Sequence, residues 1–157
     1  MCECAWCNLS EEESKWLLID NGSGSVYLAD EQDYIGRCIL VLKRHCGSLS
    51  ELTDDEFVEL KHLICRFENC LKTVLGATLC NWSCLLNDFY KKDEPTPHLH
   101  LHVRPRYRSP IILNGVSYSD EEFGHHYDHK KGSIIRDSDF LVLYTTLRDA
   151  LLQKENF

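Results

Sequence analysis

Short apolar runs separated by turn residues dominate the first part of the chain. Residues 16–19 and 26–29 are mainly apolar, and the segment 21–24 between them reads Asn-Gly-Ser-Gly, which is typical of a tight turn. This pattern predicts a β-hairpin. Residues 38–42 form an unbroken apolar run with β-branched members, as expected for a central strand that is buried on both faces.

A helical pattern follows over residues 53–75. Thr53 and Glu56 have the spacing of a capping box, and Gly76 marks the end of the helix. His62 lies off the apolar stripe, so we expect it at the surface. The stripe itself recurs at helical spacing and consists of Leu60, Leu63, Ile64, Phe67, Leu71 and Val74.

Two more strands are predicted at residues 81–87 and 98–103, and a last helix at residues 138–153. Strands and helices do not alternate regularly, so we expect an α+β fold. It would contain an antiparallel sheet of about five strands with one long helix packed on it. The sequence has no repeat and no linker long enough to separate domains. We therefore expect one domain over residues 1–107, with residues 108–157 as a C-terminal extension that packs on the same domain and ends in a helix.

The composition is that of an ordinary globular protein. Of the 157 residues, 43% are hydrophobic and 27% are charged, which argues against a disordered or fibrous chain. The sequence has neither an apolar run of about 18 residues nor the pattern of a secretory signal, so we expect a cytoplasmic protein without a membrane partner. The net charge of −8 disfavours nucleic acid as a partner, because binding it requires a basic surface.

The chain contains nine cysteines. An odd number without an export signal argues against a disulfide framework. We interpret the cysteines of the apolar runs as small buried hydrophobic residues; these are Cys38, Cys65, Cys70, Cys80 and Cys84. A separate N-terminal group contains Cys2, Cys4 and Cys7, and the spacing Cys4-x-x-Cys7 is typical of half a zinc site.

The strongest chemical signal is the run His98-Leu99-His100-Leu101-His102-Val103-Arg104. Alternate residues of a strand point to opposite faces, so the three histidines share one face and the apolar residues share the other. An edge strand with incidental histidines, or a simple metal-binding tract, would not need such strict alternation. The run therefore indicates a functional face.

This run resembles the signature of the histidine triad family of nucleotidyl hydrolases and transferases, in which apolar residues follow each histidine. Arg104 departs from the apolar residue expected there, and the resemblance covers roughly residues 4–107. It implies an enzyme that hydrolyses a nucleoside 5′-phosphate derivative, such as a dinucleoside polyphosphate or a nucleoside phosphoramidate, through a nucleotidyl-histidine intermediate. It also implies that His100 is the nucleophile, that His102 contacts the phosphate and leaving group, and that Asn87 holds the phosphate. A neutral imidazole is nucleophilic near neutral pH, which suits these roles.

Other positions depart from the family pattern. The usual donor on the leaving-group side is missing, or is displaced to Thr96. Arg37 stands where members often have a further histidine, and its guanidinium could hold a phosphate through two parallel hydrogen bonds. The usual ribose contact falls on Ala29, with Asp30 one residue away, so the resemblance implies altered nucleoside binding.

The resemblance also implies a structural zinc ion. In a subset of the family, zinc is bound by Cys-x-x-Cys, by a histidine after the second core strand and by the first triad histidine. Two thiolates and two imidazoles make a closed tetrahedral site, which is structural rather than catalytic. No organic cofactor is implied. The matching residues are Cys4, Cys7, His45 and His98, and Cys2 is a rival for Cys4.

Three functions remain open at this point: a hydrolase, a nucleotidyl transferase or phosphorylase, and a non-catalytic nucleotide-binding zinc module. His102 favours hydrolysis, because the family's nearest transferases carry glutamine there, and the complete triad argues against pure binding. Family members are commonly homodimers, so a homodimer is expected. The extension carries a further polar cluster, which we interpret as an exposed segment or a contact over the active site rather than a metal site. Its members are His125, His126, Asp128 and His129.

Overall fold

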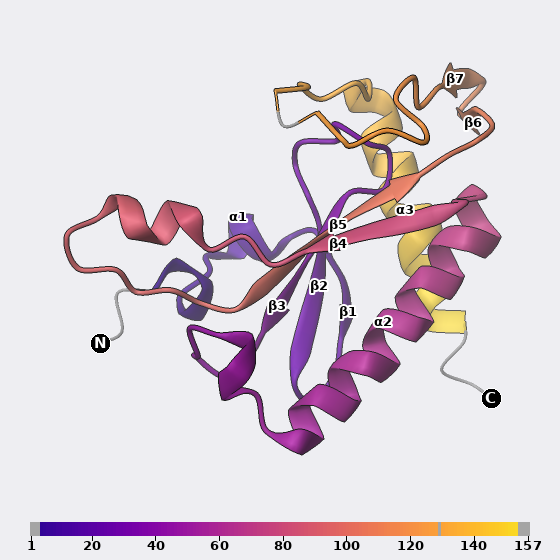
Figure 1. The fold of residues 1–157 in the computed structure, drawn as a ribbon. Coiled ribbons are helices and arrows are strands. Elements are labelled where there is room, and N and C mark those ends of the chain that lie inside the picture. The colour runs from indigo at the N-terminus through magenta and orange to yellow at the C-terminus, as the bar shows by residue number, and fades with distance from the viewer. Residues whose placement is uncertain (1–3, 129, 154–157) are drawn as a thin grey trace.

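The computed structural model describes residues 4–128 and 130–153 (Figure 1). Its helical elements are η1 (Ala5–Cys7), α1 (Glu11–Ser14), η2 (Leu49–Glu51), α2 (Asp54–Leu75), η3 (Asn87–Lys91) and α3 (Asp137–Gln153). Its strands are β1 (Leu17–Asp20), β2 (Gly24–Leu28), β3 (Cys38–Leu42), β4 (Leu79–Ser83), β5 (His100–Arg106), β6 (Ile111–Leu113) and β7 (Val116–Tyr118).

The main sheet is antiparallel, has five strands and follows the order β1-β2-β3-β5-β4. This arrangement confirms the predicted α+β fold. Strands β3 and β5 lie next to each other, with Val41 opposite His100 and Ile39 opposite His102. The histidine run is therefore held by two neighbouring strands, because β4 pairs with β5 on its other side.

Helix α2 begins and ends where the sequence predicts. Thr53 and Glu56 form both hydrogen bonds of a capping box. Gly76 closes the helix in the left-handed conformation, with φ of 73°. Leu60, Leu63 and other stripe residues pack in one cluster with Leu101 and Val103 of β5, and His62 is exposed.

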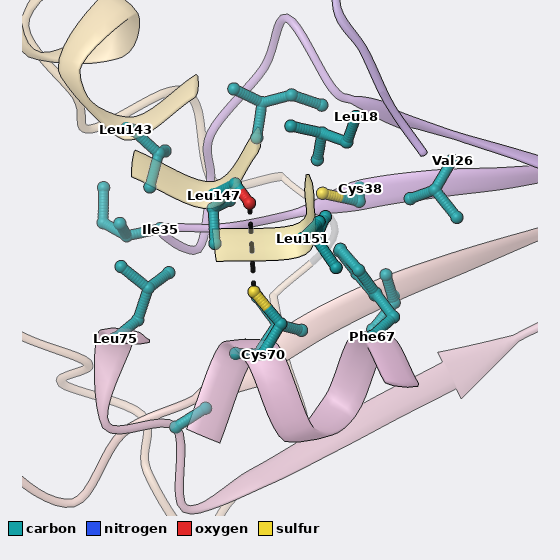
Figure 2. Packing of buried hydrophobic residues seen from close by; sticks show 14 of the residues in the cluster. Leu18, Val26, Ile35, Cys38, Phe67, Cys70, Leu75, Leu143, Leu147 and Leu151 are labelled. Carbon is teal, nitrogen blue, oxygen red and sulfur yellow. Dashed lines mark hydrogen bonds between the residues drawn. The ribbon is translucent and has the colours of Figure 1, made fainter. Parts of the chain in front are cut away.

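The C-terminal extension completes the same hydrophobic core. Helix α3 contacts both α2 and β1, and its Leu143, Leu147 and Leu151 are fully buried. Figure 2 shows them beside Phe67 and Cys70 of α2, where the Cys70 thiol lies 4.0 Å from the Leu147 carbonyl oxygen. The extension is therefore part of the packing that supports the sheet.

Several predicted boundaries were wrong. The strand predicted at residues 81–87 is Leu79–Ser83, after which the chain leaves the sheet and forms η3, which begins at Asn87. A short apolar run does not distinguish a continuing strand from another segment. The strand predicted at 98–103 begins at His100 and continues to Arg106, and the β6–β7 hairpin was not predicted.

The cysteine prediction holds only in part. Cys38 and Cys70 are buried, and Cys80 and Cys84 are partly buried, but Cys65 is exposed. Cys65 lies on the solvent side of α2, away from the apolar stripe.

Within the described ranges, no helix combines the length and the apolar character needed to cross a bilayer.

Candidate active site and metal centre

The histidine face of β5 opens into a cavity of about 390 Å³. Leu101 and Val103 point into the core with α2, so His100, His102 and Arg104 project from the opposite face of the sheet. In Figure 1 the η3 segment lies away from α2 and α3, which cover the core side. The cavity is lined by Trp6, Arg37, Leu85, Asn87, Asp88, Phe89, His100, His102 and Arg104.

His100 is oriented by the backbone of its own strand. Its Nδ1 lies 2.9 Å from the carbonyl oxygen of His98. A carbonyl oxygen only accepts hydrogen bonds, so Nδ1 carries the proton and Nε2 keeps its lone pair. Aromatic rings flank the imidazole, with the ring centres of Trp6 and Phe89 at 5.6 and 5.8 Å. Nε2 is therefore the nitrogen of His100 that keeps a lone pair available for bonding.

His102 lies beside that nitrogen. Its Nε2 is 3.2 Å from Nε2 of His100. Burial, followed by the nearby charges of His100, Arg37 and Arg104, lowers the pKa of His102 to about 4, so its ring is neutral near pH 7. The other nitrogen, Nδ1, is buried without a hydrogen-bond partner among the described residues. A proton there would be an unsatisfied donor, so the favoured tautomer carries it on Nε2.

Two arginines line the cavity beyond His102. Arg104 Nε donates to Asp33 Oδ2 at 2.8 Å, and Arg37 Nη1 lies 3.4 Å from Asp33 Oδ1. Arg37 follows Gly36, whose φ is 85°. An added Cβ there would come within 2.9 Å of Leu75 and 3.1 Å of Pro105, so glycine is required and the turn that presents Arg37 is fixed.

The predicted phosphate-binding residues are only partly brought together. Asn87 and Arg37 line the cavity with both histidines, whereas Thr96 is half-buried and does not line it. Thr96 lies between two prolines in the loop that precedes β5. The structure therefore gives no support for a displaced donor at Thr96.

The expected ribose contacts are also absent from this cavity. Ala29 is 6% exposed, and its carbonyl oxygen accepts a hydrogen bond from the buried Gln32. Asp30 is exposed and lines a different depression, together with Trp16 and Phe140. Neither residue reaches the histidine face.

Sequence reasoning missed six residues of this region, of which Leu85 and Asp88 only line the cavity. Trp6 and Phe89 have no motif that marks them, and Asp33 is an acidic residue in an unpatterned loop. Arg104 did carry a signal, because a charged residue replaces the expected apolar one. That departure from the motif identifies a cavity residue.

The second site is a cluster of Cys4, Cys7, His45 and His98. One potential ligand atom from each lies within 4.8 Å of all the others. His98 Nδ1 is 3.2 Å from Cys4 Sγ, 3.5 Å from Cys7 Sγ and 3.2 Å from His45 Nδ1. Tetrahedral zinc with bonds of about 2.0–2.3 Å places its ligand atoms about 3.3–3.8 Å apart. The separations therefore fit a four-coordinate metal.

The hydrogen bonds of His98 support the same interpretation. Its side chain is fully buried, and Nε2 lies 2.6 Å from the carbonyl oxygen of Leu42. The proton is therefore on Nε2, and the bare Nδ1 faces the thiols, as in a metal-bound histidine. Burial also lowers the pKa of His98, which favours the neutral, metal-binding form.

The extension reaches the edge of the cavity. The Tyr127 ring centre lies 4.6 Å from the guanidinium carbon of Arg104. His125 and His126 are exposed, and they belong to no metal-binding group found among the described residues. Cys2 and His129 lie outside the described residues, so the rivalry of Cys2 with Cys4 is not tested.

No protein-family model matches the chain, and no curated protein is similar enough to count as a match. Solved structures do match. A hypothetical histidine triad nucleotide-binding protein from Sulfolobus tokodaii superposes with a TM-score of 0.66 at 14% identity, over 97% of this chain and 94% of that one. A zinc-bound histidine triad family protein from Mycobacterium smegmatis gives 0.62 at 19% identity, over 98% and 96%.

A uridylyltransferase also superposes, with a TM-score of 0.67 and 20% identity, over 96% of this chain. The match covers 45% of the uridylyltransferase, so the chain spans less than half of that protein. Together these likenesses show that the chain has the fold of the histidine triad proteins, as the sequence motif predicts.

Proposed function

We propose that this protein is a nucleotidyl hydrolase of the histidine triad type, which acts on nucleoside 5′-phosphate derivatives. One observation carries the proposal: His100 presents Nε2 to a cavity, 3.2 Å from Nε2 of His102, while its Nδ1–H is held by the His98 carbonyl. A pre-oriented nucleophile beside a neutral hydrogen-bond donor is what covalent nucleotidyl transfer requires. The nucleotide-binding and zinc-bound descriptions of two similar structures support it.

In the first step, Nε2 of His100 attacks the α-phosphorus. The new N–P bond forms as the bond from phosphorus to the leaving group breaks, and the leaving group keeps that electron pair. The His100 ring becomes cationic, and its Nδ1–H bond to the His98 carbonyl stabilises this charge. His102 Nε2–H and the Asn87 amide, which line the cavity, would donate to the phosphate oxygens.

In the second step, water attacks the phosphorus from the side that the leaving group has left. The N–P bond breaks, and its electron pair returns to Nε2 of His100. The proton lost by the attacking water passes to solvent. His100 thus regains its starting tautomer, and the nucleoside monophosphate is released.

We also propose that Cys4, Cys7, His45 and His98 hold a structural zinc ion. All four ligands come from the protein, so such a site has no open position for substrate. The ion would supply folding energy and fix His98, whose carbonyl orients His100. A homodimer and a cytoplasmic location complete the proposal.

A nucleotidyl transferase or phosphorylase is the second candidate, because the uridylyltransferase shares the fold. It would use the same intermediate and pass the nucleotidyl group to a phosphate or sugar phosphate instead of water. A non-catalytic nucleotide-binding zinc module is the third candidate. It gives no reason for the oriented lone pair on His100.

Mass spectrometry distinguishes an enzyme that forms the intermediate from the non-catalytic module, and an adduct without nucleoside monophosphate would favour the transferase. The protein would be incubated with a panel of nucleotides and then quenched with denaturant at alkaline pH, because the N–P bond of a nucleotidyl-histidine is hydrolysed by acid. We expect a nucleotidyl adduct on His100 and nucleoside monophosphate as product. His62→Ala serves as the control, since His62 is an exposed histidine outside the cavity. Binding without an adduct or product would instead support the module.

A further inference from the structure

Arg37 and Arg104 lie side by side and share a single buried carboxylate. Arg37 precedes Cys38, which pairs with Val103 in the sheet, so the two arginines extend from the same end of the β3–β5 pair. Asp33, which is 2% exposed, contacts Arg104 at 2.8 Å and Arg37 at 3.4 Å. Two like charges at neighbouring strand positions repel each other unless something compensates them.

The compensation is incomplete. Asp33 can neutralise one of the two guanidinium groups, and Glu31, at 3.6 Å from Arg37, has a side chain that is 77% exposed and therefore screened by water. Arg37 Nε is buried without a hydrogen-bond partner among the described residues. Asp88, the acidic residue that lines the cavity, has a side chain that is 86% exposed and is paired with Lys91. The two guanidinium groups thus share one buried carboxylate, in a chain whose net charge is −8, and burying an incompletely compensated charge is costly.

The surroundings hold both arginines in place. The loop that carries Asp33 is fastened by the fully buried Gln32, whose amide donates to the carbonyls of Ala29 and Arg37 at 2.7 and 2.8 Å. Arg104 packs against the ring of Tyr127. A fixed pair of cations that face a cavity is arranged to receive an anion.

We propose that Arg37 and Arg104 form a second anion subsite, which binds a phosphate group of the leaving group beyond His102. This inference rests on the proposed function and narrows it. The preferred substrates join the nucleotide to a phosphate through a pyrophosphate bond, and nucleoside phosphoramidates are poor substrates. Arg104 becomes a specificity-determining residue, and Tyr127 of the extension a positioning residue that acts through it.

The chemistry of the two leaving groups differs in a way that suits this subsite. When a pyrophosphate bond breaks, the bridging oxygen keeps the electron pair and departs as a phosphate anion, whose charge two guanidinium groups stabilise. When a phosphoramidate breaks, the nitrogen must gain a proton to leave as an amine. The arginines carry no readily transferable proton, so they assist the first reaction and not the second.

The same subsite also serves an incoming phosphate. The leaving group departs opposite to His100, and the acceptor of the second step enters from that side. Inorganic phosphate held by the arginines would attack the nucleotidyl-histidine and form a nucleoside diphosphate. Leaving-group phosphate and free phosphate therefore share one recognition chemistry.

The test compares two substrates that share an adenylyl group: diadenosine triphosphate and adenosine 5′-phosphoramidate. Arg37→Gln keeps the hydrogen bond between Asp33 and Arg104, so it is the cleaner variant. Arg104→Gln removes that bond, so its folding is checked by a thermal melt. Arg108→Gln is the control, because Arg108 is an exposed arginine that does not line the cavity.

We expect each cavity variant to lower kcat/KM for diadenosine triphosphate about 10- to 100-fold, the scale of a lost charged hydrogen bond. The value for the phosphoramidate should change less than about threefold. A parallel fall for both substrates, or no change for either, would overturn the subsite. Adding inorganic phosphate to the phosphoramidate reaction distinguishes the two sources of phosphate. If the parent forms ADP and Arg37→Gln does not, the subsite also binds an acceptor phosphate. If the parent forms no ADP but still prefers diadenosine triphosphate, the subsite binds leaving groups only.

A binding measurement keeps the proposal testable if the parent turns over neither substrate and the proposed function itself fails. Inorganic pyrophosphate would be titrated calorimetrically into the metal-loaded parent, Arg37→Gln and Arg108→Gln. We expect the parent and the control to bind it equally, and Arg37→Gln to bind about tenfold more weakly or worse. Equal affinity in all three proteins, or no binding by the parent, refutes the subsite independently of catalysis.

Discussion

The row of residues from His98 to Arg106 differs between its ends and its middle. At the ends, His98 is fully buried and Arg106 is 2% exposed. Arg106 makes four side-chain hydrogen bonds, two of them to Asp120 and one each to the carbonyls of His125 and Glu122. In the middle, His102 has a buried nitrogen without a partner, and Arg104 makes one hydrogen bond among the described residues.

Arg104 and Arg106 differ in how completely their charges are compensated. The two arginines are neighbours on one face of β5, both are buried, and each contacts an aspartate and an aromatic ring. Arg106 has its own carboxylate, whereas Arg104 shares Asp33 with Arg37. Native interiors satisfy buried polar groups almost completely. The ends of the row are therefore satisfied by the protein itself, whereas its middle keeps polar groups that face the cavity without partners among the described residues, as the proposed ligand site requires.

The largest expected effect is on His100. His100→Ala removes the proposed nucleophile, so turnover should fall by several orders of magnitude. The melting temperature should change by only a few degrees, because the imidazole faces a cavity. Steady-state kinetics and a thermal melt check the two expectations. If His100→Ala turned over substrate at nearly the rate of the parent, with contamination excluded, the middle of the row would not be catalytic and would not differ from the ends in function.

A large effect on stability is expected at the His98 end. The double variant Cys4→Ser, Cys7→Ser should lose its zinc and about 5 kcal/mol or more of stability, which corresponds to about 10 °C or more in Tm for a chain of this size. Elemental analysis of parent protein purified without chelators should find one zinc per chain. Cys65→Ser, at an exposed cysteine, should retain the metal. A parent without zinc contradicts the proposed metal site.

Arg106→Met probes the opposite end. It leaves the carboxylate of Asp120, 2% exposed, without its charged partner. Breaking a buried ion pair in this way costs about 3–5 kcal/mol, and denaturant unfolding would measure it. Arg108→Met, at an exposed neighbour, should cost less than about 1 kcal/mol. If Arg104→Gln destabilised the protein as much as Arg106→Met, both arginines would be structural.

Much of this arrangement could be predicted from the sequence, because it depends on local patterns. The capping box at Thr53 predicts the start of α2, and strict alternation from His98 to His102 predicts a histidine face. The Cys4-x-x-Cys7 spacing points to the metal cluster. Each of these signals is contained within a few residues.

The missed features depend on contacts between distant segments. Asp33 lies in an unpatterned loop and meets Arg104 across 71 residues of sequence. Trp6 reaches His100 only because the N-terminal segment folds back onto the sheet. No sequence pattern in the extension predicts that Asp120 contacts Arg106 or that Tyr127 contacts Arg104. Such pairings follow from the tertiary fold, which local periodicity does not encode.

The smallest expected effect concerns the pH dependence of stability. The pKa of His102 is lowered to about 4, whereas an unfolded histidine titrates near 6.5. The unfolded chain therefore binds a proton that the folded chain rejects as the pH falls from about 6.5 to 4. The contribution of the neutral ring to stability is complete above about pH 6.5 and is lost through that interval.

The groups that face His102 set the size of this effect. Burial, His100, Arg37 and Arg104 all oppose a charge on the ring, whereas Asp33 and the exposed Asp88 favour it. Because the side chain is only partly buried, we expect a loss of about 1–2 kcal/mol rather than the full value of the shift. Urea unfolding at a series of pH values should show a shallower acid slope for His102→Gln than for the parent. His62→Gln, at an exposed histidine, should follow the parent. If the acid slope of His102→Gln equals that of the parent, the folded protein does not oppose protonation of His102, and the proposed effect of the nearby cations is wrong.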